Sequence, residues 1–280
     1  MADCDLLVIG AGPGGGSAAL HAARAGLSTV IVEADSDVGV PVHCGECLSQ
    51  IAVDNLDLEL PDEVIALDCK GIRVIFPDGT SRLLTEKGYV LEKHKFEQWL
   101  CSEAVKLGAQ LKLSHKVKSM ERIYNSKNEF LYWKIDGKGD AFPIECKAVI
   151  DASGVTGAAT KILEMGTQIE MIAGIQYEMT DVENDGYLDF YLWPEYSPHG
   201  YVWMIPKDGG RANVGLVTTD KKGAIKYLDK FVNETYLKEK EIQNPEWRKP
   251  GIKPRPFGGT IPISGPREIT TGDGLILVGD

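Results

Sequence analysis

A glycine-rich turn near the N-terminus constrains the fold of this chain more than any other feature. The turn, Gly10 to Gly15, follows the apolar run Asp5 to Ile9 and precedes a segment of helical spacing that ends near Ala25. Gly26 then leads into a second apolar run, 28–33. This order predicts a strand, a helix and a second parallel strand, which together make the βαβ unit of a Rossmann-like α/β fold.

The glycines of this turn match G-x-G-x-x-G, the motif that binds the pyrophosphate of a dinucleotide. Gly10 permits the tight turn, Gly12 lets the backbone approach the pyrophosphate, and Gly15 lets helix and strand pack closely. Pro13 and Gly14 lie between them, where the helix N-terminus offers amide donors and a positive dipole. The turn therefore predicts a dinucleotide site; in the alternative interpretation it is only a structural loop.

Glu33 ends the second predicted strand and is followed by Ala34. An acidic residue at this place accepts hydrogen bonds from ribose hydroxyls in dinucleotide-binding folds. We therefore expect Glu33 and Ala34 to contact the adenosine half of the cofactor. A solvated strand end is the alternative.

Composition excludes several classes of function. The chain has 280 residues, 43% of them hydrophobic, and a formal net charge of -11, which disfavours a nucleic-acid partner. No apolar stretch approaches the roughly 18 to 20 residues that span a bilayer. We expect a cytoplasmic protein that contacts a membrane at most peripherally.

The remaining pattern predicts two domains. A helix over 91–107 and strands over 110–113, 130–135 and 144–150 continue the first, and the apolar run 274–278 returns to it as a parallel strand. Four long strands rich in aromatic and β-branched residues (172–180, 187–193, 201–205 and 212–218), the turn 207–210 and a helix over 224–241 predict an inserted antiparallel sheet. The predicted division is 1–170 with 266–280, including a small excursion near 62–86, against 171–265.

Six cysteines are scattered along the chain without the density of a disulfide framework, and we expect them to be reduced. Cys44 and Cys47 have the spacing of a redox pair or of two metal ligands. A structural zinc would need two further ligands, and no second such pair exists. The prediction is therefore that the chain holds no metal.

Two later segments resemble motifs of the hydroxylase-like flavoproteins. The segment 148–154 reads A-V-I-D-A-S-G, and 274–280 reads G-L-I-L-V-G-D. The resemblance implies that FAD is the cofactor, that Ala152 and Gly154 line its site and that Asp280 holds its ribityl chain. Lys93 stands where these proteins usually have arginine, so it keeps the charge of a cofactor ligand without the planar fork.

A narrower resemblance rests on the segment from Pro198 to Lys207, P-H-G-Y-V-W-M-I-P-K. It is similar to the P-x-x-Y-x-W-x-F-P-K signature of archaeal and plant geranylgeranyl reductases, with Ile205 in place of phenylalanine. Tyr201 and Trp203 share one face of a strand and are expected to wall a channel for an apolar chain. The alternative is that they form sheet core.

The segment 41–49, P-V-H-C-G-E-C-L-S, resembles the cysteine-containing loop that covers the flavin in the same family. By position Cys44 is the catalytic candidate, and Cys44 and Gly45 are expected beside the cofactor; an inert thiol is the alternative for Cys44. Cys47 stands where the family has a small residue. Because the family's Gly-Asp motif continues into a helix, we expect this chain to be part of a longer protein.

The resemblance implies an FAD-dependent reductase that saturates carbon–carbon double bonds of geranylgeranyl chains in archaeal membrane-lipid biosynthesis. Its partners would be an isoprenoid lipid and an external electron donor: nicotinamide, ferredoxin or deazaflavin. Three alternatives stay open: a flavin-dependent halogenase or hydroxylase, a quinone-linked electron-transfer flavoprotein, and an FAD-binding module without turnover. The approach of residues 201–206 to the W-x-W-x-I-P pattern supports the halogenase alternative, whereas Tyr201 and Lys207 argue against it.

Overall fold

The computed structural model describes residues 2–166, 169–236 and 256–280, and the chain forms two compact units. The first unit contains residues 1–41, 94–170 and 264–280, and the second contains residues 42–93 and 171–263. No helix in the described residues is long and apolar enough to cross a membrane.

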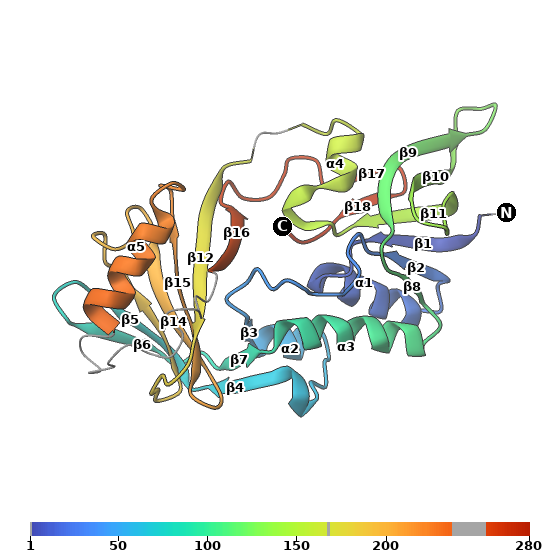
Figure 1. Cartoon of the computed structure of the whole chain (residues 1–280). Coiled ribbons are helices and arrows are strands. Elements are labelled where there is room, and N and C mark those ends of the chain that lie inside the picture. The colour runs from blue at the N-terminus through green and yellow to red at the C-terminus, as the bar shows by residue number, and fades with distance from the viewer. Residues whose placement is uncertain (1, 167–168, 237–255) are drawn as a thin grey trace. The chain divides into compact units, whose positions relative to one another are not determined.

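An eight-stranded sheet forms the first unit (Figure 1). Its five central strands are parallel, in the order β18 (Leu275–Leu277), β11 (Ile144–Asp151), β1 (Cys4–Ile9), β2 (Thr29–Val32) and β8 (Gln110–Lys112). The short strand β17 (Thr271–Gly272) pairs with β18, and the hairpin of β9 (Lys116–Tyr124) and β10 (Phe130–Lys138) pairs antiparallel with β11.

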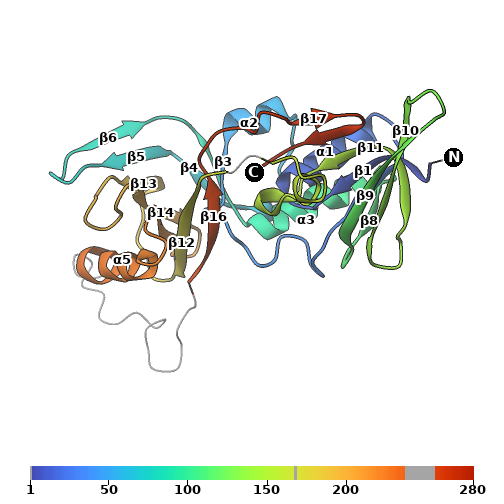
Figure 2. The same ribbon diagram turned by 90° about the horizontal axis from the view of Figure 1, so that it is seen from above.

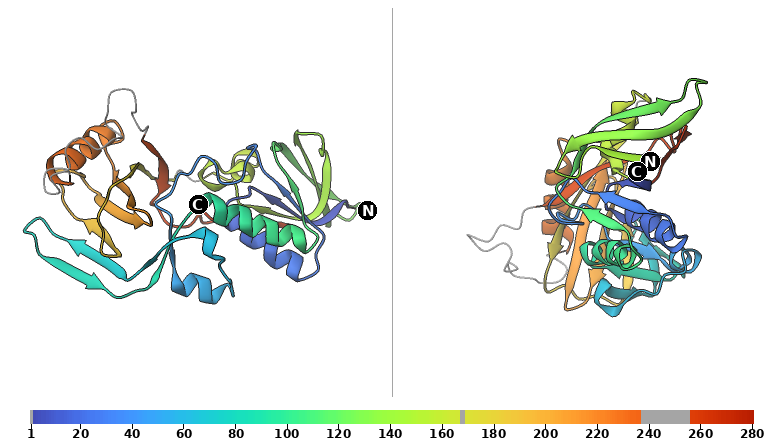
Figure 3. Two further views of the ribbon diagram at one scale, coloured as in Figure 1. Left: turned by 60° about the horizontal axis from the view of Figure 1, so that its bottom comes forward. Right: turned by 90° about the vertical axis from the view of Figure 1, so that its right-hand side faces the viewer.

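The helices α1 (Pro13–Arg24) and α3 (Lys93–Lys106) run side by side along this sheet (Figure 3). Gly16 permits their close approach, because a Cβ placed there would lie 2.9 Å from the Cβ of Leu100. The short helix α4 (Ala158–Ile162) follows β11. The βαβ unit predicted from the glycine turn is present, because β1 and β2 are parallel neighbours and α1 connects them.

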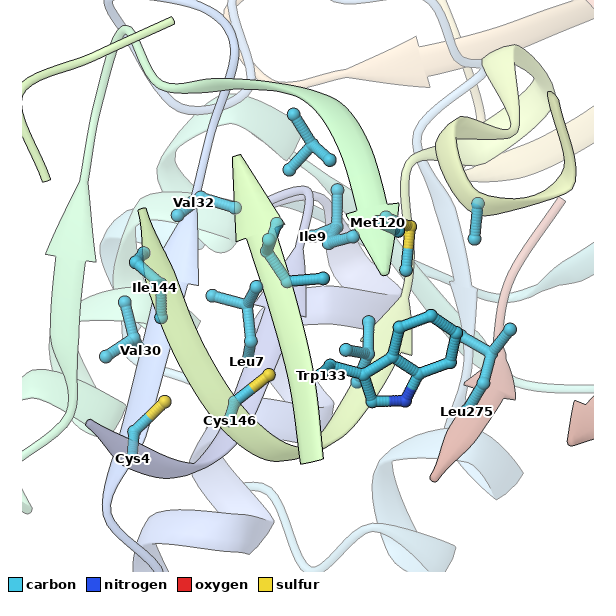
Figure 4. Close-up of a cluster of buried hydrophobic side chains, with 14 residues drawn as sticks. Cys4, Leu7, Ile9, Val30, Val32, Met120, Trp133, Ile144, Cys146 and Leu275 are labelled. Atoms are coloured by element: carbon cyan, nitrogen blue, oxygen red, sulfur yellow. The ribbon is translucent and has the colours of Figure 1, made fainter. Parts of the chain in front are cut away.

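A cluster of buried side chains holds β1, β2, β11 and the β9–β10 hairpin together (Figure 4). Trp133 lies fully buried within it. Its indole N–H donates to the carbonyl oxygens of Asp273 (3.1 Å) and Gly274 (3.0 Å), so its burial leaves no donor without a partner. This pair of bonds fixes the turn that leads into β18.

A seven-stranded sheet forms most of the second unit. Its order is β16 (Phe257–Pro262), β12 (Met171–Met179), β15 (Arg211–Thr218), β14 (Tyr201–Lys207), β13 (Tyr187–Tyr191), β5 (Gly71–Ile75) and β6 (Ser81–Leu84). All neighbours are antiparallel except β13 and β5. The helix α5 (Ala224–Phe231) packs on β12 and β15 and continues as a π-helical turn, Val232–Tyr236.

A small antiparallel sheet completes the second unit, in the order β3 (Cys47–Ser49), β7 (Gly88–Leu91) and β4 (Ile65–Cys69). The helix α2 (Gln50–Asn55) follows β3, and the hydroxyl of Ser49 caps it by accepting from the N–H of Ala52 at 3.2 Å. A 3-10 turn, Asp62–Val64, precedes β4.

The predicted domain division differs from the observed units in residues 42–93, which were expected with the first domain. The hairpin of β5 and β6 extends the second sheet by pairing in parallel with β13 (Figure 2). Sequence patterning did not show this pairing, because the partners lie more than 100 residues apart, with Tyr187 opposite Gly71. The far end of the helix predicted over 224–241 lies outside the described residues.

Candidate active site

Three sequence motifs meet at one edge of the first unit's sheet. Ile9 of β1 lies opposite Asp151 of β11, and Asp151 lies opposite Leu277 of β18, so the three parallel strands end level with one another. A Cβ placed on Gly14 would lie 3.6 Å from the side chain of Val278 and 3.9 Å from the Cβ of Ala152. The glycine turn, the loop after β11 and the Gly-Asp segment are therefore neighbours, as binding at the carboxyl ends of parallel strands requires.

The glycines of the turn fall into two kinds. A Cβ on Gly10, whose φ is +96°, would lie 2.5 Å from the carbonyl oxygen of Ala152, and a Cβ on Gly15 would lie 1.9 Å from the carbonyl oxygen of Gly10. A Cβ on Gly12, by contrast, would have no described atom within 4 Å. Gly10 and Gly15 are thus needed for packing, whereas Gly12 leaves open space.

That open space lies at the N-terminus of α1, where Pro13 is the first residue. The first N–H groups of a helix have no partner within the helix, and the helix dipole favours an anion there. The residues present therefore fit the pyrophosphate of a dinucleotide such as FAD.

Glu33 ties the end of β2 to the glycine turn. Its Oε2 accepts from the backbone N–H of Ala11 at 2.7 Å, and its Oε1 accepts from that of Asp35 at 2.9 Å. Each carboxylate oxygen can accept a further hydrogen bond, so both remain available to ribose hydroxyls. Ala34 is exposed beside it. The predicted contacts of these two residues with the cofactor stay predictions.

Asp151 shapes the loop after β11, a role that the sequence pattern did not predict. Its buried carboxylate accepts from the N–H of Ser153 at 3.1 Å and from that of Ala159 at 2.7 Å. These bonds hold Ala152 and the 3-10 turn Gly154–Thr156 against the strand end. Gly154 has a φ of +65° and open space around its Cα. Asp280 lies exposed, three residues beyond β18.

In the second unit, one face of β14 lies against the loop that contains Cys44 and Cys47. Because side chains alternate along a strand, Tyr201, Trp203, Ile205 and Lys207 share this face. The terminal methyl of Ile205 would lie 3.0 Å from a Cβ on Gly45, so the two segments are in close contact. The strand with the Y-x-W-x-I-P-K pattern is therefore the support of the cysteine loop.

A chain of two hydrogen bonds joins β14 to the backbone of Cys44. The indole N–H of Trp203 donates to Gln176 Oε1 at 3.1 Å, and Gln176 Nε2 donates to the carbonyl oxygen of Cys44 at 2.8 Å. Trp203 is only 7% exposed and belongs to a core cluster of the sheet. Trp203 is therefore buried in the sheet, and its predicted role in binding substrate stays a prediction.

Tyr201 differs from Trp203 because it is 37% exposed. Its ring packs edge-on against Phe190 at 5.5 Å between centroids, and it lies 6.1 Å from the ring of Trp203. Desolvation, with the nearby thiol of Cys47, raises the pKa of the Tyr201 phenol. Tyr201 thus keeps a face that a substrate can reach, and its predicted role in binding substrate stays a prediction.

Glu46 lies at the centre of a buried polar network that sequence patterning missed. Its carboxylate accepts from Lys207 Nζ at 2.8 Å, from Asn213 Nδ2 at 2.6 Å and from the backbone N–H of Lys93 at 3.1 Å. Glu46 is 3% exposed and Lys207 is 1% exposed. The signal that could have revealed this pair is a lysine at an inward position of an otherwise apolar strand, since buried charges require partners.

The network continues to Glu92, which accepts from Lys207 Nζ at 3.2 Å and from Arg211. Partial burial opposes ionisation of Glu92, but the hydrogen bond from Arg211 and the charge of Lys207 outweigh it and lower the pKa of this carboxyl. Glu92 thus stays charged and supplies Lys207 with a second carboxylate.

Both loop cysteines are exposed. The sulfur of Cys44 accepts from the backbone N–H of Glu46 at 3.3 Å. Desolvation of its sulfur, with the nearby Cys44, Cys69 and Glu46, raises the pKa of the Cys47 thiol to about 12. Cys47 is therefore a thiol at neutral pH. Among the described residues no group of three His, Cys, Asp or Glu side chains is placed to hold a metal.

Lys93 is the last residue of the second unit and the first residue of α3. Its backbone N–H binds Glu46, as described above. The predicted contact between its ammonium group and the cofactor stays a prediction. The structure thus groups ten of the predicted cofactor residues in the first unit, and Cys44, Gly45, Lys93, Tyr201 and Trp203 in the second.

Two protein-family models match the chain. Residues 5–162 match the model described as FAD dependent oxidoreductase, and residues 170–245 match the model described as geranylgeranyl reductase catalytic domain. The first match contains the glycine turn and the loop after β11. The second contains β14 and therefore the support of the cysteine loop.

Archaeal proteins named digeranylgeranylglycerophospholipid reductase are similar over nearly the whole chain. The protein from Methanopyrus kandleri is 32% identical over 285 residues, covering 99% of this chain and 69% of that protein. The protein from Methanocaldococcus jannaschii is 33% identical over 288 residues, covering 99% and 69%.

Solved structures agree with the sequence matches. A geranylgeranyl bacteriochlorophyll reductase-like protein from Thermoplasma acidophilum superposes with a TM-score of 0.82 at 30% identity, covering 98% of this chain and 70% of that one. A flavin-dependent brominase superposes with a TM-score of 0.75 at 17% identity, covering 99% and 71%, which shows a shared fold only.

Proposed function

The chain belongs to the geranylgeranyl reductase family of FAD-dependent oxidoreductases, and we propose that it saturates carbon–carbon double bonds of geranylgeranyl chains on an archaeal glycerophospholipid precursor. One observation supports the proposal beyond family membership. Trp203 and Lys207 of the strand with the Y-x-W-x-I-P-K pattern hold the Cys44 loop, through Gln176 and Glu46. This arrangement joins the two segments that the family resemblance singled out into one structure.

Residues of the first unit would hold the cofactor. The backbone of Gly12 and Gly14 at the start of α1 receives the pyrophosphate, and Glu33 receives the ribose. The loop at Ala152 and Gly154, with Asp280, lines the remainder of the site. Bound and reduced, FAD supplies a hydride to one carbon of the double bond.

The second carbon of the double bond must receive a proton. An isolated alkene has no carbonyl group to accept negative charge, so positive charge develops on the more substituted carbon until the proton and the hydride have both been delivered. We assign proton delivery to the exposed thiol of Cys44, directly or through a water that it binds. Cys47 suits this role less well, because desolvation raises the pKa of its thiol to about 12.

An apolar ring and a polar hydroxyl group suit Tyr201 to the mouth of a site for a flexible isoprenoid chain. The phenol end interacts with water while the ring lies against the hydrocarbon. Trp203 and Gln176 act behind it by holding the backbone of Cys44.

Two partners complete the proposal. An external donor supplies the two electrons consumed for each double bond, and nicotinamide, ferredoxin and deazaflavin donors are the three to compare as reductants of the oxidised protein. Because the substrate is a membrane lipid, we propose a cytoplasmic enzyme that binds the membrane surface peripherally. Flotation with vesicles of archaeal phospholipid tests this, and protein that stays in the soluble fraction contradicts it.

Product mass tests the central reaction. The protein is loaded with FAD, reduced with dithionite without oxygen and incubated with a geranylgeranyl glycerophospholipid. The proposal predicts a gain of two hydrogens for each double bond, whereas the fully saturated lipid stays unchanged as the control. Bound FAD together with an unchanged unsaturated lipid would overturn it.

A further inference from the structure

The loop that carries Cys44 contains an uncommon backbone conformation. Glu46 has a φ of +72°, in the left-handed region that residues with a Cβ rarely occupy. In the same loop, the N–H of Glu46 donates to the sulfur of Cys44, two residues earlier, at 3.3 Å. A conformation of this kind persists only where surrounding contacts enforce it.

The side chain of Glu46 provides those contacts. It is 3% exposed and accepts hydrogen bonds from three different segments: Lys207 in β14, Asn213 in β15 and the N–H of Lys93. The backbone carbonyl of Glu46 also accepts from the N–H of Leu91 at 2.8 Å. This bond lies next to the pair Cys47 and Val90, where β3 and β7 are paired. Both the side chain and the backbone of Glu46 are thus anchored to regular structure.

The side-chain amide of Asn213 is held by its hydrogen bond to Glu46. Its Nδ2 donates to Glu46, while its Oδ1 is buried and has no partner among the described residues. A buried amide with an unsatisfied oxygen costs free energy, and the amide would be free to turn if Glu46 did not fix it. In β15 the side-chain nitrogen of Asn213 therefore donates to Glu46, while its side-chain oxygen stays buried without a partner among the described residues.

We propose that Glu46 is a positioning residue whose buried carboxylate, held by Lys207 and Asn213, fixes the backbone between Cys44 and Cys47 and so holds the Cys44 thiol in one orientation. The inference rests on the function proposed above, in which Cys44 faces the reacting double bond. It gives Lys207 a role in the Y-x-W-x-I-P-K pattern: the lysine anchors the loop from one side as Trp203 and Gln176 anchor it from the other.

Hydrogen exchange tests the positioning without any measurement of turnover. In Glu46→Gln the amides of residues 44–47 should exchange at least about tenfold faster than in the wild-type chain, because the anchor has lost its charge. Asp189→Asn is the matched control: Asp189 is also buried and pairs with Arg73 at 2.7 Å in the same sheet. The control should change exchange at 44–47 by less than about twofold.

Two outcomes overturn the inference. Unchanged exchange at 44–47 in Glu46→Gln would show that other contacts fix the loop, and faster exchange spread evenly over the sheet would show a general loss of stability. If Glu46→Gln does not fold, Asn213→Ala decides, because it keeps the ion pair; it should speed local exchange by about threefold, and no change there would overturn the inference.

Turnover then connects positioning to chemistry. With the geranylgeranyl lipid, Glu46→Gln should lower kcat about tenfold or more while KM stays within about twofold, because the loop orients the reacting group rather than binding the lipid. A change confined to KM would contradict the role. Absence of lipid reduction by the wild-type chain would refute the proposed function, whereas the exchange result would still decide whether Glu46 fixes the loop.

Discussion

The two units of this chain build their sites by different means. In the first unit the site consists of backbone at the ends of parallel strands, and the residues that matter most are glycines whose place a side chain would fill. In the second unit the site is a loop held by buried polar side chains, with Glu46 and Lys207 at the centre. The first site is therefore sensitive to volume, and the second is sensitive to charge.

This difference explains which substitutions each site tolerates. A backbone site tolerates replacement of the surrounding side chains as long as the strand ends and the glycines remain. A buried ion pair tolerates little, because removing one partner leaves the other as an uncompensated charge in the interior.

The largest effect is expected from Lys207→Met. The change leaves Glu46 buried beside Asn213 without a cation, which should lower the free energy of unfolding by about 3–5 kcal/mol. The double variant Lys207→Met with Glu46→Gln removes both charges and should recover most of that loss. Urea denaturation measures the free energy of unfolding of both variants. A double variant as unstable as the single one would show that the loss does not come from the unpaired charge of Glu46.

Gly15→Ala tests the sensitivity to volume in the first unit. Its Cβ would lie 1.9 Å from the carbonyl oxygen of Gly10, so strand and helix must separate, at a cost of about 3 kcal/mol. Thermal unfolding followed by circular dichroism measures the loss. A variant as stable as the wild-type chain would show that the turn is not packed as described.

Gly12→Ala is the matched control, because the same methyl group meets no described atom within 4 Å. We expect the free energy of unfolding to change by no more than about 0.5 kcal/mol. FAD should nevertheless bind at least about tenfold more weakly, since the methyl group occupies space that the pyrophosphate needs. Titration of the apoprotein with FAD measures this, and unchanged affinity would place the pyrophosphate elsewhere.

A smaller effect separates the two aromatic residues of β14. Trp203→Phe removes the donor to Gln176 and should cost about 1–2 kcal/mol of stability, because a buried amide oxygen loses its partner. Tyr201→Phe should cost no more than about 0.5 kcal/mol and should act on KM for the lipid. Equal losses of stability would contradict the assignment of Trp203 to the core and of Tyr201 to the accessible face.

The smallest effect concerns the pH dependence of Cys47. Its thiol has a pKa of about 12, so the reactive thiolate is scarce near neutral pH and increases as the pH rises. Alkylation of Cys47 by iodoacetamide, followed by peptide mass spectrometry, should therefore speed up about tenfold per pH unit from pH 7 to 10. A rate that levels off below about pH 9 would show that its sulfur is not desolvated.

Sequence patterning predicted the first unit well, because its rules are local. A strand, a glycine turn and a helix follow one another in the chain, and the structure has β1, α1 and β2 at those places. The strands β12, β13, β14 and β15 were also predicted within a few residues, whereas β16 was not predicted. The parallel pairing of β5 with β13 was missed, because it joins segments more than 100 residues apart.

The polar network of the second unit was missed for a related reason. Glu46 and Lys207 are separated by 161 positions, and nothing in the neighbourhood of either names the other as its partner. Trp203 was expected at a channel wall because alternation shows only which face a side chain shares. How deeply Trp203 is buried depends on the Cys44 loop that packs on this face of β14, and the sequence pattern does not show that contact.

Reoxidation of the flavin tests the proposed reaction most directly. The FAD-loaded wild-type chain and Cys44→Ala are reduced without oxygen and mixed with the geranylgeranyl lipid, and flavin absorbance is recorded as the lipid is saturated. We expect both proteins to retain FAD, the wild-type flavin to reoxidise in step with lipid saturation, and the flavin of Cys44→Ala to reoxidise at least about 100-fold more slowly. A wild-type flavin that stays reduced beside unchanged lipid would contradict the proposed function, and a Cys44→Ala variant that reacts at the wild-type rate would contradict proton delivery by Cys44.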